Sequence, residues 1–513
     1  MELTHKKFLI TSLPFTAASV SVPLIGAVDT AIAGGLGSYH YINSVALGSV
    51  IFSTIFWLFN FLGLTASGFA SQSLGSGNKQ EELCAFLRGS ILACGIGLVI
   101  ILLQNHIFNA AVQFFNPPAE TLDFMRLYFN IIVYTVPAAL FYQTAQGWLA
   151  GIMQVRFSVA VGLTANIANA LLAFILVYGC GLGVAGVAAA SALANILAAA
   201  LALYGFYKSR PCSLKSVNPA QLFSGQDFAK LLNCSGHLAI RTLCMLIMIN
   251  TFMSQSSAFG GEILAANSIL MQIQYVMGDV FTGFSQAAAI YAGIAAGEGN
   301  KKLLQSTLKI SAVQSLAAAF LQTGIYFLWR AKIAGLFTGL PQILAAVNRY
   351  DMFIVFFPVL SALGIVYYGV FNGTLQTTPI CISMLFTAAS YLLAKAALVP
   401  KLGNSGLWLA FSGILRCPQR FFINICAFAA EKISLPHIKN PSLSAKAGKE
   451  CYFTPVFQIR PGKKMSVSYT SGLPRWRVGT KLPWQSLPPL ISMPSARQCV
   501  KRSCVSSSLC PEW

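Results

Sequence analysis

The chain has 513 residues, of which 56% are hydrophobic and 9% charged, and its mean hydropathy is +0.67. A soluble domain carries about 25% charged residues, so this composition excludes a water-soluble protein. Of the formal charge of +20, more than half comes from the segment 432–513, which holds 13 Lys and Arg and 2 Asp and Glu. Apolar runs of roughly 20 residues, the length of a membrane-spanning helix, recur along the rest. An all-α integral membrane protein is therefore predicted.

The apolar runs predict twelve transmembrane helices. They lie at 8–34, 45–70, 89–115, 127–150, 157–178, 183–207, 236–257, 264–293, 308–329, 352–372, 379–399 and 405–429. The first run is too long for the apolar core of a signal peptide and contains Asp29, so it is interpreted as a span. These runs predict a six-helix lobe at 1–207, a polar linker at 208–235, a second six-helix lobe at 236–431 and a basic tail at 432–513.

The two predicted lobes repeat each other in sequence. Gly75, Gly77, Asn78, Lys79, Tyr128, Gly147, Gly151 and Gln154 recur 222 positions later as Gly297, Gly299, Asn300, Lys301, Tyr350, Gly369, Gly373 and Gln376. Because six spans return the chain to its starting side, the repeats must share one orientation. Parallel repeats are related by an axis along the membrane normal, and a transport site is expected between them near the middle of the bilayer.

Lys and Arg are concentrated in one set of predicted loops. The amino terminus, the linker and the loops on their side hold most of the basic residues of the helical body. The positive-inside rule then places both termini and the linker in the cytoplasm. After Glu431, Pro, Ser, Lys and Arg dominate. This tail is either a basic segment that contacts anionic lipid or a disordered end without a selected role, and no folded domain is expected there.

A charged side chain inside a membrane span is costly and is a functional hypothesis by default. Asp29 lies well inside the first span, where Pro23 and Gly26 are expected to loosen the helix and free backbone carbonyls beside it. A desolvated carboxylate at this position is a candidate proton acceptor in the working pH range. The alternative is a structural carboxylate satisfied by hydrogen bonds.

Further polar residues in the spans suggest a polar interior. Asp279 in the eighth span and Arg241 in the seventh are candidates for an ion pair that lowers the cost of burial, although Asp279 also suits a cavity wall. Asn166 and Asn169 lie on one face of the fifth span and either line a cavity or bond neighbouring helices. The remaining cavity candidates are Gln143, Gln272 and Tyr275.

Several function classes lack their sequence signatures. The chain has no phosphate-binding Gly-x-x-x-x-Gly-Lys-Ser/Thr loop, no Gly-x-Ser-x-Gly elbow and no His-Glu-x-x-His motif. Its 13 cysteines form no Cys-x-x-Cys pair with histidine partners. ATP-driven transport, an enzyme with catalytic residues, a metal site, a bound cofactor and a nucleic-acid partner are therefore not expected.

The quoted motifs resemble the multidrug and toxic compound extrusion (MATE) transporters, specifically their DinF-like branch. The resemblance rests on Pro23–Thr30, on Trp57-Leu-Phe59 and on Gly68-Phe-Ala-Ser-Gln72 followed by Gly75-x-Gly77, and it extends over roughly residues 8–430. Gly151-Ile-Met-Gln154, the asparagine pair of the fifth span and the Arg241 and Asp279 neighbourhoods are similar to the same branch.

The resemblance implies twelve helices in two lobes around a central cleft, in a bacterial inner membrane, exchanging H⁺ or Na⁺ for an organic and often cationic compound. Asp29 matches the family's coupling carboxylate, and Asn169 and Asp279 match an asparagine and a carboxylate of the family. Where many relatives carry an acid one turn after that asparagine, this chain has Ala173. The missing carboxylate weakens a Na⁺ site, so proton coupling is favoured.

The leading hypothesis is a monomeric, rocker-type antiporter whose partners are a small organic substrate and membrane lipid. A flippase for lipid-linked precursors is the first alternative, but it calls for a cationic cavity, and Arg and Lys are scarce inside the spans. A non-transporting membrane scaffold is the second alternative, and neither the repeat nor the intramembrane Asp29 is needed for that role.

Overall fold

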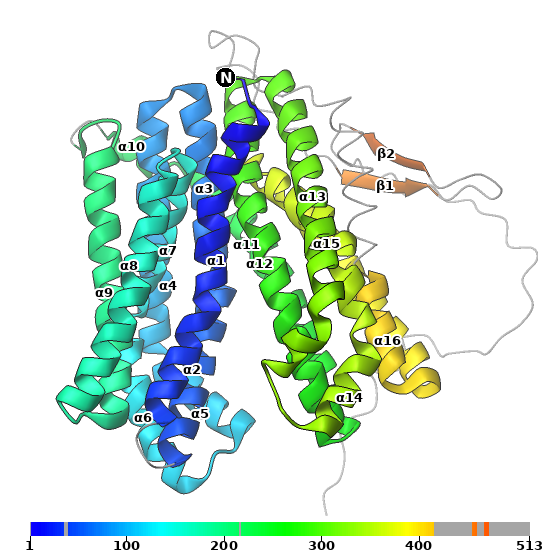
Figure 1. Ribbon diagram of the computed structural model, residues 1–513. Helices are drawn as coiled ribbons and strands as arrows, with labels where there is room; N and C mark the ends of the chain where they lie inside the picture. Colours follow the sequence, from blue (N-terminus) through cyan, green and yellow to red (C-terminus); the bar gives the residue numbers. More distant parts are fainter. Residues whose placement is uncertain (1, 35–38, 215–216, 415–453, 459–465, 471–513) are drawn as a thin grey trace, which may run out of the picture. The chain divides into compact units, whose positions relative to one another are not determined.

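The computed structural model describes residues 2–34, 39–214, 217–414, 454–458 and 466–470, with the side chains at 22–31, 33–34, 39 and 414 and in the last two segments outside the description. The chain divides into two compact units, 1–438 and 439–513. The first unit is a helical bundle (Figure 1). In the second, strands β1 (Thr454–Gln458) and β2 (Ser466–Thr470) pair antiparallel, with Thr454 opposite Thr470.

The amino-terminal lobe, here the amino lobe, consists of the helices up to the linker. They are α1 (His5–Gly34), α2 (Tyr39–Leu58), α3 (Phe61–Ser76), α4 (Lys79–Leu102), α5 (Gln104–Phe115), α6 (Ala119–Val133), α7 (Val136–Gly151), α8 (Val155–Phe174), the π-helix η1 (Ile175–Gly179) and α9 (Gly183–Ser209). The linker contains one short helix, α10 (Pro219–Leu222).

The carboxy-terminal lobe, here the carboxy lobe, follows the linker. It consists of α11 (Gly225–Ala258), α12 (Gly261–Glu298), α13 (Lys301–Gly335), α14 (Pro341–Tyr350), α15 (Met352–Gly373) and α16 (Thr377–Ile414). The backbone of α16 kinks at Gly403, where φ is +56°, so this helix joins two segments. That kink lies between the eleventh and twelfth predicted spans.

Nine helices of the described residues are long and apolar enough to cross a membrane, or ten when the pair α6 and α7, bent by 51°, counts as one span. The helix α1 covers the first predicted span, and much of the twelfth, 405–429, lies outside the described residues. An all-α, multi-pass membrane fold is confirmed.

The bounds of one predicted span were wrong, and another span contains a break that was not predicted. The second predicted span, 45–70, lies within one candidate span, His40–Ser76, which has a short break at Phe59 and Asn60 between α2 and α3. The third begins at Lys79 and ends at Leu102, because residues 104–115 form the separate amphipathic helix α5. Pro23 does not interrupt α1, which runs as one helix from His5 to Gly34.

The sequence repeat extends to the local backbone. After α3, Gly77 adopts a left-handed conformation (φ +69°) and the Asn78 side chain accepts a hydrogen bond from the Glu81 amide. After α12, Gly299 (φ +66°) and Asn300 form the same helix end and helix cap. Left-handed φ favours glycine, and an asparagine side chain satisfies the free amides of a helix start. The repeated motif therefore builds the same sharp turn in both lobes.

Helix packing inside each lobe repeats as well. A Cβ on Gly147 of α7 would overlap the carbonyl oxygen of Gly63 in α3, and a Cβ on Gly369 of α15 would overlap that of Ser285 in α12. Positions 63 and 285, like 147 and 369, are equivalent in the repeat. Small residues at such crossings let helix backbones approach closely, which is what drives helix association in lipid.

The lobes meet where α3 and α12 end, close to the start of α1 (Figure 1). A Cβ on Gly75 would overlap the carbonyl oxygen of Ile294, and a Cβ on Gly297 would overlap that of Gln72. The repeat exchanges these two contacts, because it relates position 75 to 297 and position 72 to 294, so the axis relating the lobes passes between α3 and α12 at this level. We call this end of the bundle the amino-terminal end.

Hydrogen bonds also join the lobes in this half of the bundle. They connect Thr11 with Tyr291, Thr16 with the carbonyl of Val280, Gln314 with the carbonyl of His5, Gln72 with the carbonyl of Gly373, and Asn372 with the carbonyl of Leu64. The closed amino-terminal end thus combines close backbone packing with satisfied polar groups.

The Gly369 crossing predicts a strong sensitivity to a single methyl group. Gly369→Ala should destabilise the protein by about 1–3 kcal/mol because the added Cβ forces α15 away from α12. Gly324→Ala on α13 is the matched control, since a Cβ there meets nothing within 4 Å. Thermal unfolding of the detergent-purified protein measures the difference. Equal melting temperatures for the two variants would contradict the proposed crossing.

Candidate functional site

The segment that carries Asp29 belongs to α1, which packs against α8, α9 and α12. The Asp29 side chain lies outside the described residues, so its contacts are not part of this description. Three residues further on, the carbonyl of Ile32 accepts a hydrogen bond of 3.1 Å from the Tyr178 hydroxyl of η1. This bond sets the register of α1 against the end of α8, the helix with the predicted asparagine pair.

The asparagine pair differs in burial. Asn166 is half-buried, whereas Asn169 is buried and donates a hydrogen bond of 3.0 Å from Nδ2 to the Ser191 hydroxyl on α9. Its Oδ1 is buried and has no hydrogen-bond partner among the described residues. The amide of Asn169 therefore bonds a neighbouring helix at one end and carries a buried acceptor at the other, and its place in a cavity wall stays a prediction.

The helix α8 passes into a π-helix, η1, within two turns after Asn169. Single π-turns inside helices are rare and occur often at functional sites. No residue type in Ile175–Gly179 signals this geometry, so sequence reasoning missed it. The buried Ala173 is in the turn just before it.

Gln143 of α7 is half-buried beside the break between α2 and α3. Its Nε2 donates a hydrogen bond of 3.2 Å to the carbonyl of Phe56, and its Oε1 is buried without a hydrogen-bond partner in the described part of the chain. The broken helix frees carbonyls that a side-chain amide can satisfy. Gln143 therefore supports the break, and its oxygen is, like Oδ1 of Asn169, a buried acceptor of the amino lobe.

Gln272 and Asp279 lie on one face of α12. Closer to the amino-terminal end of the bundle, the same face packs against α1. Gly283, one turn beyond Asp279, contacts Thr16 of α1. Positions 272, 276, 279 and 283 share one helix face by their spacing of three and four residues. Gln272 is exposed, Asp279 is half-buried, and Tyr275 next to this face is 37% exposed.

The equivalent positions of the amino lobe lie on α2. The repeat relates Val50 to Gln272 and Trp57 to Asp279, and Val50 and Trp57 are 46% and 38% exposed. Further from the amino-terminal end than the Gly75 and Gly297 contacts, the corresponding faces of α2 and α12 are thus accessible in both lobes. They differ in chemistry: the carboxy lobe presents an amide and a carboxylate, and the amino lobe an aliphatic and an aromatic side chain.

The candidate ion pair between Arg241 and Asp279 is not formed in this structure. The Arg241 guanidinium lies over the Tyr368 ring of α15, with 4.0 Å from Cζ to the ring centre. A cation–π contact with this half-buried ring compensates part of the cost of burying the charge. Sequence spacing identified both charges but could not reveal the aromatic partner, which belongs to a distant segment of the chain.

A buried acid that the sequence analysis did not select lies before α15. Asp351 is 2% exposed, and its Oδ2 is 3.5 Å from Nη1 of Arg330. Burial raises the pKa of Asp351, while Arg330 and a backbone hydrogen bond from Met352 lower it. Because residue 351 falls between predicted spans, it did not count as an intramembrane charge.

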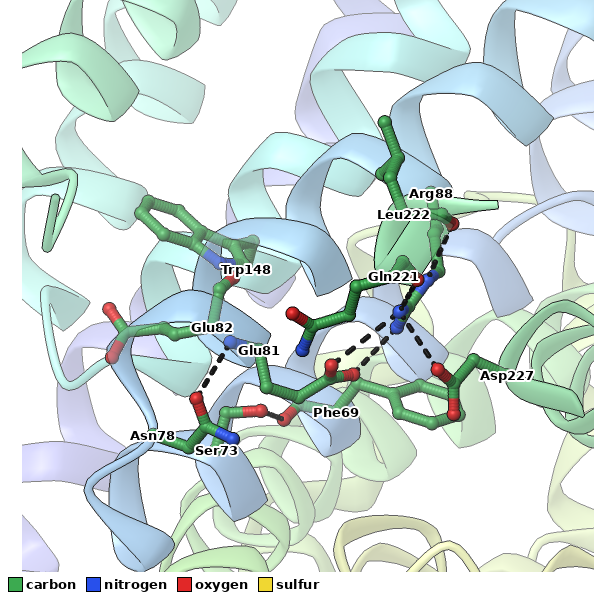
Figure 2. A network of polar contacts seen from close by, with 10 residues as sticks. All are labelled: Phe69, Ser73, Asn78, Glu81, Glu82, Arg88, Trp148, Gln221, Leu222 and Asp227. Carbon is green, nitrogen blue, oxygen red and sulfur yellow. Dashed lines mark hydrogen bonds and ion pairs between the residues drawn. The ribbon is translucent and has the colours of Figure 1, made fainter. Parts of the chain in front are cut away.

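A polar network at the amino-terminal end surrounds Arg88 of α4, which is only 3% exposed (Figure 2). Its guanidinium donates to Glu81 at 2.6 Å, to Asp227 of α11 at 2.9 Å, and to the carbonyls of Gln221 and Leu222 in α10. One arginine thus binds the linker and the start of α11 to the amino lobe. Nothing in the sequence connected Arg88 with these partners far along the chain.

A helical bundle of two repeated lobes, with an amide and a carboxylate on the accessible face of one lobe and apolar side chains on that of the other, is the architecture of a multi-pass membrane transporter. Family comparison agrees: the MatE family model matches residues 14–175 and 238–394, and the chain belongs to this family. The two matched segments fall in the two lobes.

Relatives of known name match over most of the chain. DNA damage-inducible protein F of Escherichia coli is 30% identical over 407 residues, 79% of this chain and 88% of that protein. Multidrug resistance protein MdtK of Yersinia pseudotuberculosis is 22% identical over 419 residues, 79% of this chain and 91% of that protein. The predicted resemblance to the DinF-like branch of the MATE transporters is confirmed.

Solved structures share the fold. A MOP superfamily transporter from Pyrococcus furiosus matches with a TM-score of 0.76 at 18% identity, over 83% of this chain and 97% of that one. The outward-facing conformation of a multidrug resistance MATE family transporter matches with the same TM-score, identity and coverage.

The unpartnered Oδ1 of Asn169 predicts a role that differs from helix packing. Asn169→Leu should lower transport by about tenfold or more, equivalent to about 1.4 kcal/mol, with a near-normal melting temperature. Asn195→Leu is the control, because Asn195 likewise donates one hydrogen bond to a hydroxyl outside its own helix, that of Thr135 in the bend between α6 and α7. Efflux and thermal unfolding are measured for both. An equal loss of transport in both variants would show that Asn169 acts only in helix packing.

Proposed function

We propose that this chain is a secondary antiporter that exports organic, often cationic compounds in exchange for H⁺, by rocker-type alternating access. The observation that carries the proposal is the one-ended contact between repeated lobes. Gly75 and Gly297 pack tightly at the amino-terminal end, while Trp57 and Gln272 further along remain accessible. Two lobes that meet at one end and are related by a two-fold axis suit a site that opens alternately to either side.

The Lys and Arg bias supports a cytoplasmic amino-terminal end in a bacterial inner membrane. The basic residues Lys79, Arg88, Lys208 and Lys301 all belong to this end. With this orientation the closed end faces the cytoplasm and the accessible faces are open to the outside. The MdtK relatives are named multidrug resistance proteins, which supports an exported substrate of varied structure.

A cationic substrate suits the accessible faces. Asp279 supplies a carboxylate on α12, and Trp57 on α2 offers an aromatic face at the equivalent position of the other lobe. A carboxylate attracts an organic cation, and an aromatic ring binds it by a cation–π contact. Together, Asp279 and Trp57 select a substrate for its positive charge and planar shape rather than for one precise structure, as a multidrug site requires.

Asp29 is the proposed coupling residue. Its ionised form favours the state that holds the substrate, and protonation from outside removes the charge, repacks α1 against α8 and weakens the substrate site. A proton shifts the equilibrium only through its different affinity for the two states. Ala173 removes one oxygen ligand that a Na⁺ site would use, which supports H⁺ as the coupling ion.

Efflux of ethidium from proteoliposomes under separately imposed H⁺ and Na⁺ gradients tests the proposal. Wild-type protein should respond to the H⁺ gradient, and Asp29→Asn should lose that response because its side chain cannot take up a proton at neutral pH. Asp123→Asn, which changes an exposed carboxylate on α6, is the control. If wild-type efflux responded to the Na⁺ gradient alone, the coupling ion would be Na⁺ and not H⁺. If efflux responded to neither gradient, the flippase alternative would be favoured.

A further inference from the structure

The first turns of α1 and α11 each lie on the opposite lobe. Phe8 of α1 is fully buried, and its ring stacks with those of Phe284 and Tyr291 in α12. Lys230 of α11 has its Nζ 5.7 Å from the centre of the Phe69 ring in α3. Positions 8 and 230, like 69 and 291, are equivalent in the repeat. The two contacts are therefore equivalent, and each lobe receives the helix start of the other.

The two crossings differ in chemistry. At the start of α1 the bonds are neutral: the Thr11 and Tyr291 hydroxyls are 2.9 Å apart, and Gln314 donates to the carbonyl of His5. At the start of α11 the residue that corresponds to His5 is Asp227, whose Oδ2 is 2.9 Å from Nη2 of Arg88. One crossing is held by apolar packing and hydroxyls, and the other by an ion pair.

The helix α11 is held by both lobes within a few turns. Asp227 and Lys230 contact the amino lobe. Cys234 then contacts the carbonyl of Leu375 at 3.8 Å, and His237 lies 2.9 Å from the Thr377 hydroxyl, both in the carboxy lobe. Because α11 is one continuous helix, it cannot keep its contacts with both lobes when they separate at this end. Since α11 belongs to the carboxy lobe, its contact with Arg88 of the amino lobe must then break.

Arg88 is suited to release Asp227 at low cost. The guanidinium keeps Glu81 and the carbonyls of Gln221 and Leu222 as acceptors, so it is not left unpaired when the aspartate leaves. Asp227 is 41% exposed, and water replaces its lost partner. The contacts of Arg88 with Glu81 and the two carbonyls are therefore permanent, whereas its contact with Asp227 is releasable. We call this arrangement a latch.

We propose that the Arg88–Asp227 contact is a releasable ionic latch between the lobes, closed in the state described here and open when the amino-terminal end opens. This inference rests on the proposed function, because it requires a second state with that end open. It assigns Arg88 and Asp227 a positioning role in the balance between the two states, without contact to substrate.

Hydrogen–deuterium exchange of the full-length protein in nanodiscs tests the latch without any substrate or gradient. Asp227→Asn should raise exchange about two- to fivefold in residues 68–76 and 283–298, which form the closed contact, as loss of a partly exposed ion pair predicts. Moving from about 50 to about 500 mM salt should raise exchange there in the wild type, because salt screens exposed charges, and should have no added effect in Asp227→Asn.

Two further variants separate the latch from general loosening. Asp123→Asn, an exposed carboxylate on α6, should leave exchange in both segments unchanged. Tyr291→Phe removes the hydroxyl contact of the neutral crossing and should raise exchange in the same segments while keeping the wild-type response to salt.

Exchange in Asp227→Asn equal to wild type at both salt concentrations overturns the latch. Should that variant fail to fold, the salt response of the wild type decides, and its absence overturns the proposal as well. Wild-type protein that shows the salt response but no cation efflux would leave the latch in place and remove only the proposed substrate and coupling.

Discussion

Close backbone packing between α3 and α12 is the constraint on which the rest of this structure depends. At Gly75 and Gly297 each helix presses against a carbonyl of the other, in two contacts that the sequence repeat makes equivalent. Lipid provides no hydrophobic force between apolar helices, so such packing has to supply the attraction. Tight contact of this kind is lost steeply with distance, which favours two discrete arrangements of the lobes over a continuous range.

The rest of the amino-terminal end stabilises this contact from its edges. The starts of α1 and α11 cross to the opposite lobes on either side of the central packing, through Phe8 on Tyr291 and through Asp227 on Arg88. Edge contacts of modest strength are useful in a transporter, because a state held too firmly would not exchange with the other. Small differences in their strength are sufficient to shift the populations of two nearly balanced states.

Sequence alone predicted the fold class, the repeat and its parallel orientation, because apolar runs and the recurrence of Gly-x-Gly-Asn-Lys are local signals. It did not predict α5, since an amphipathic helix directly after a span extends the apolar run. Nor did it find the partners of Arg241 and Arg88, Tyr368 and Asp227, because contacts between distant segments leave no local pattern. For Asn169 it left two roles open: the hydrogen bond to Ser191 fits helix packing, and the cavity role stays a prediction.

In the proposed antiporter, the chemistry of substrate binding arises at positions where the two repeats differ. Equivalent backbones carry Trp57 against Asp279 on the accessible faces and Phe8 against Lys230 at the crossings. A strictly symmetric pair of lobes would place like groups opposite each other, and two facing carboxylates would repel while two facing aromatics would collapse together. Divergence at these positions keeps the shared packing that closes the bundle and gives one lobe the charge and the other the ring. In the proposed antiporter the repeat therefore accounts for the motion of the lobes, and the positions where the repeats differ account for substrate recognition.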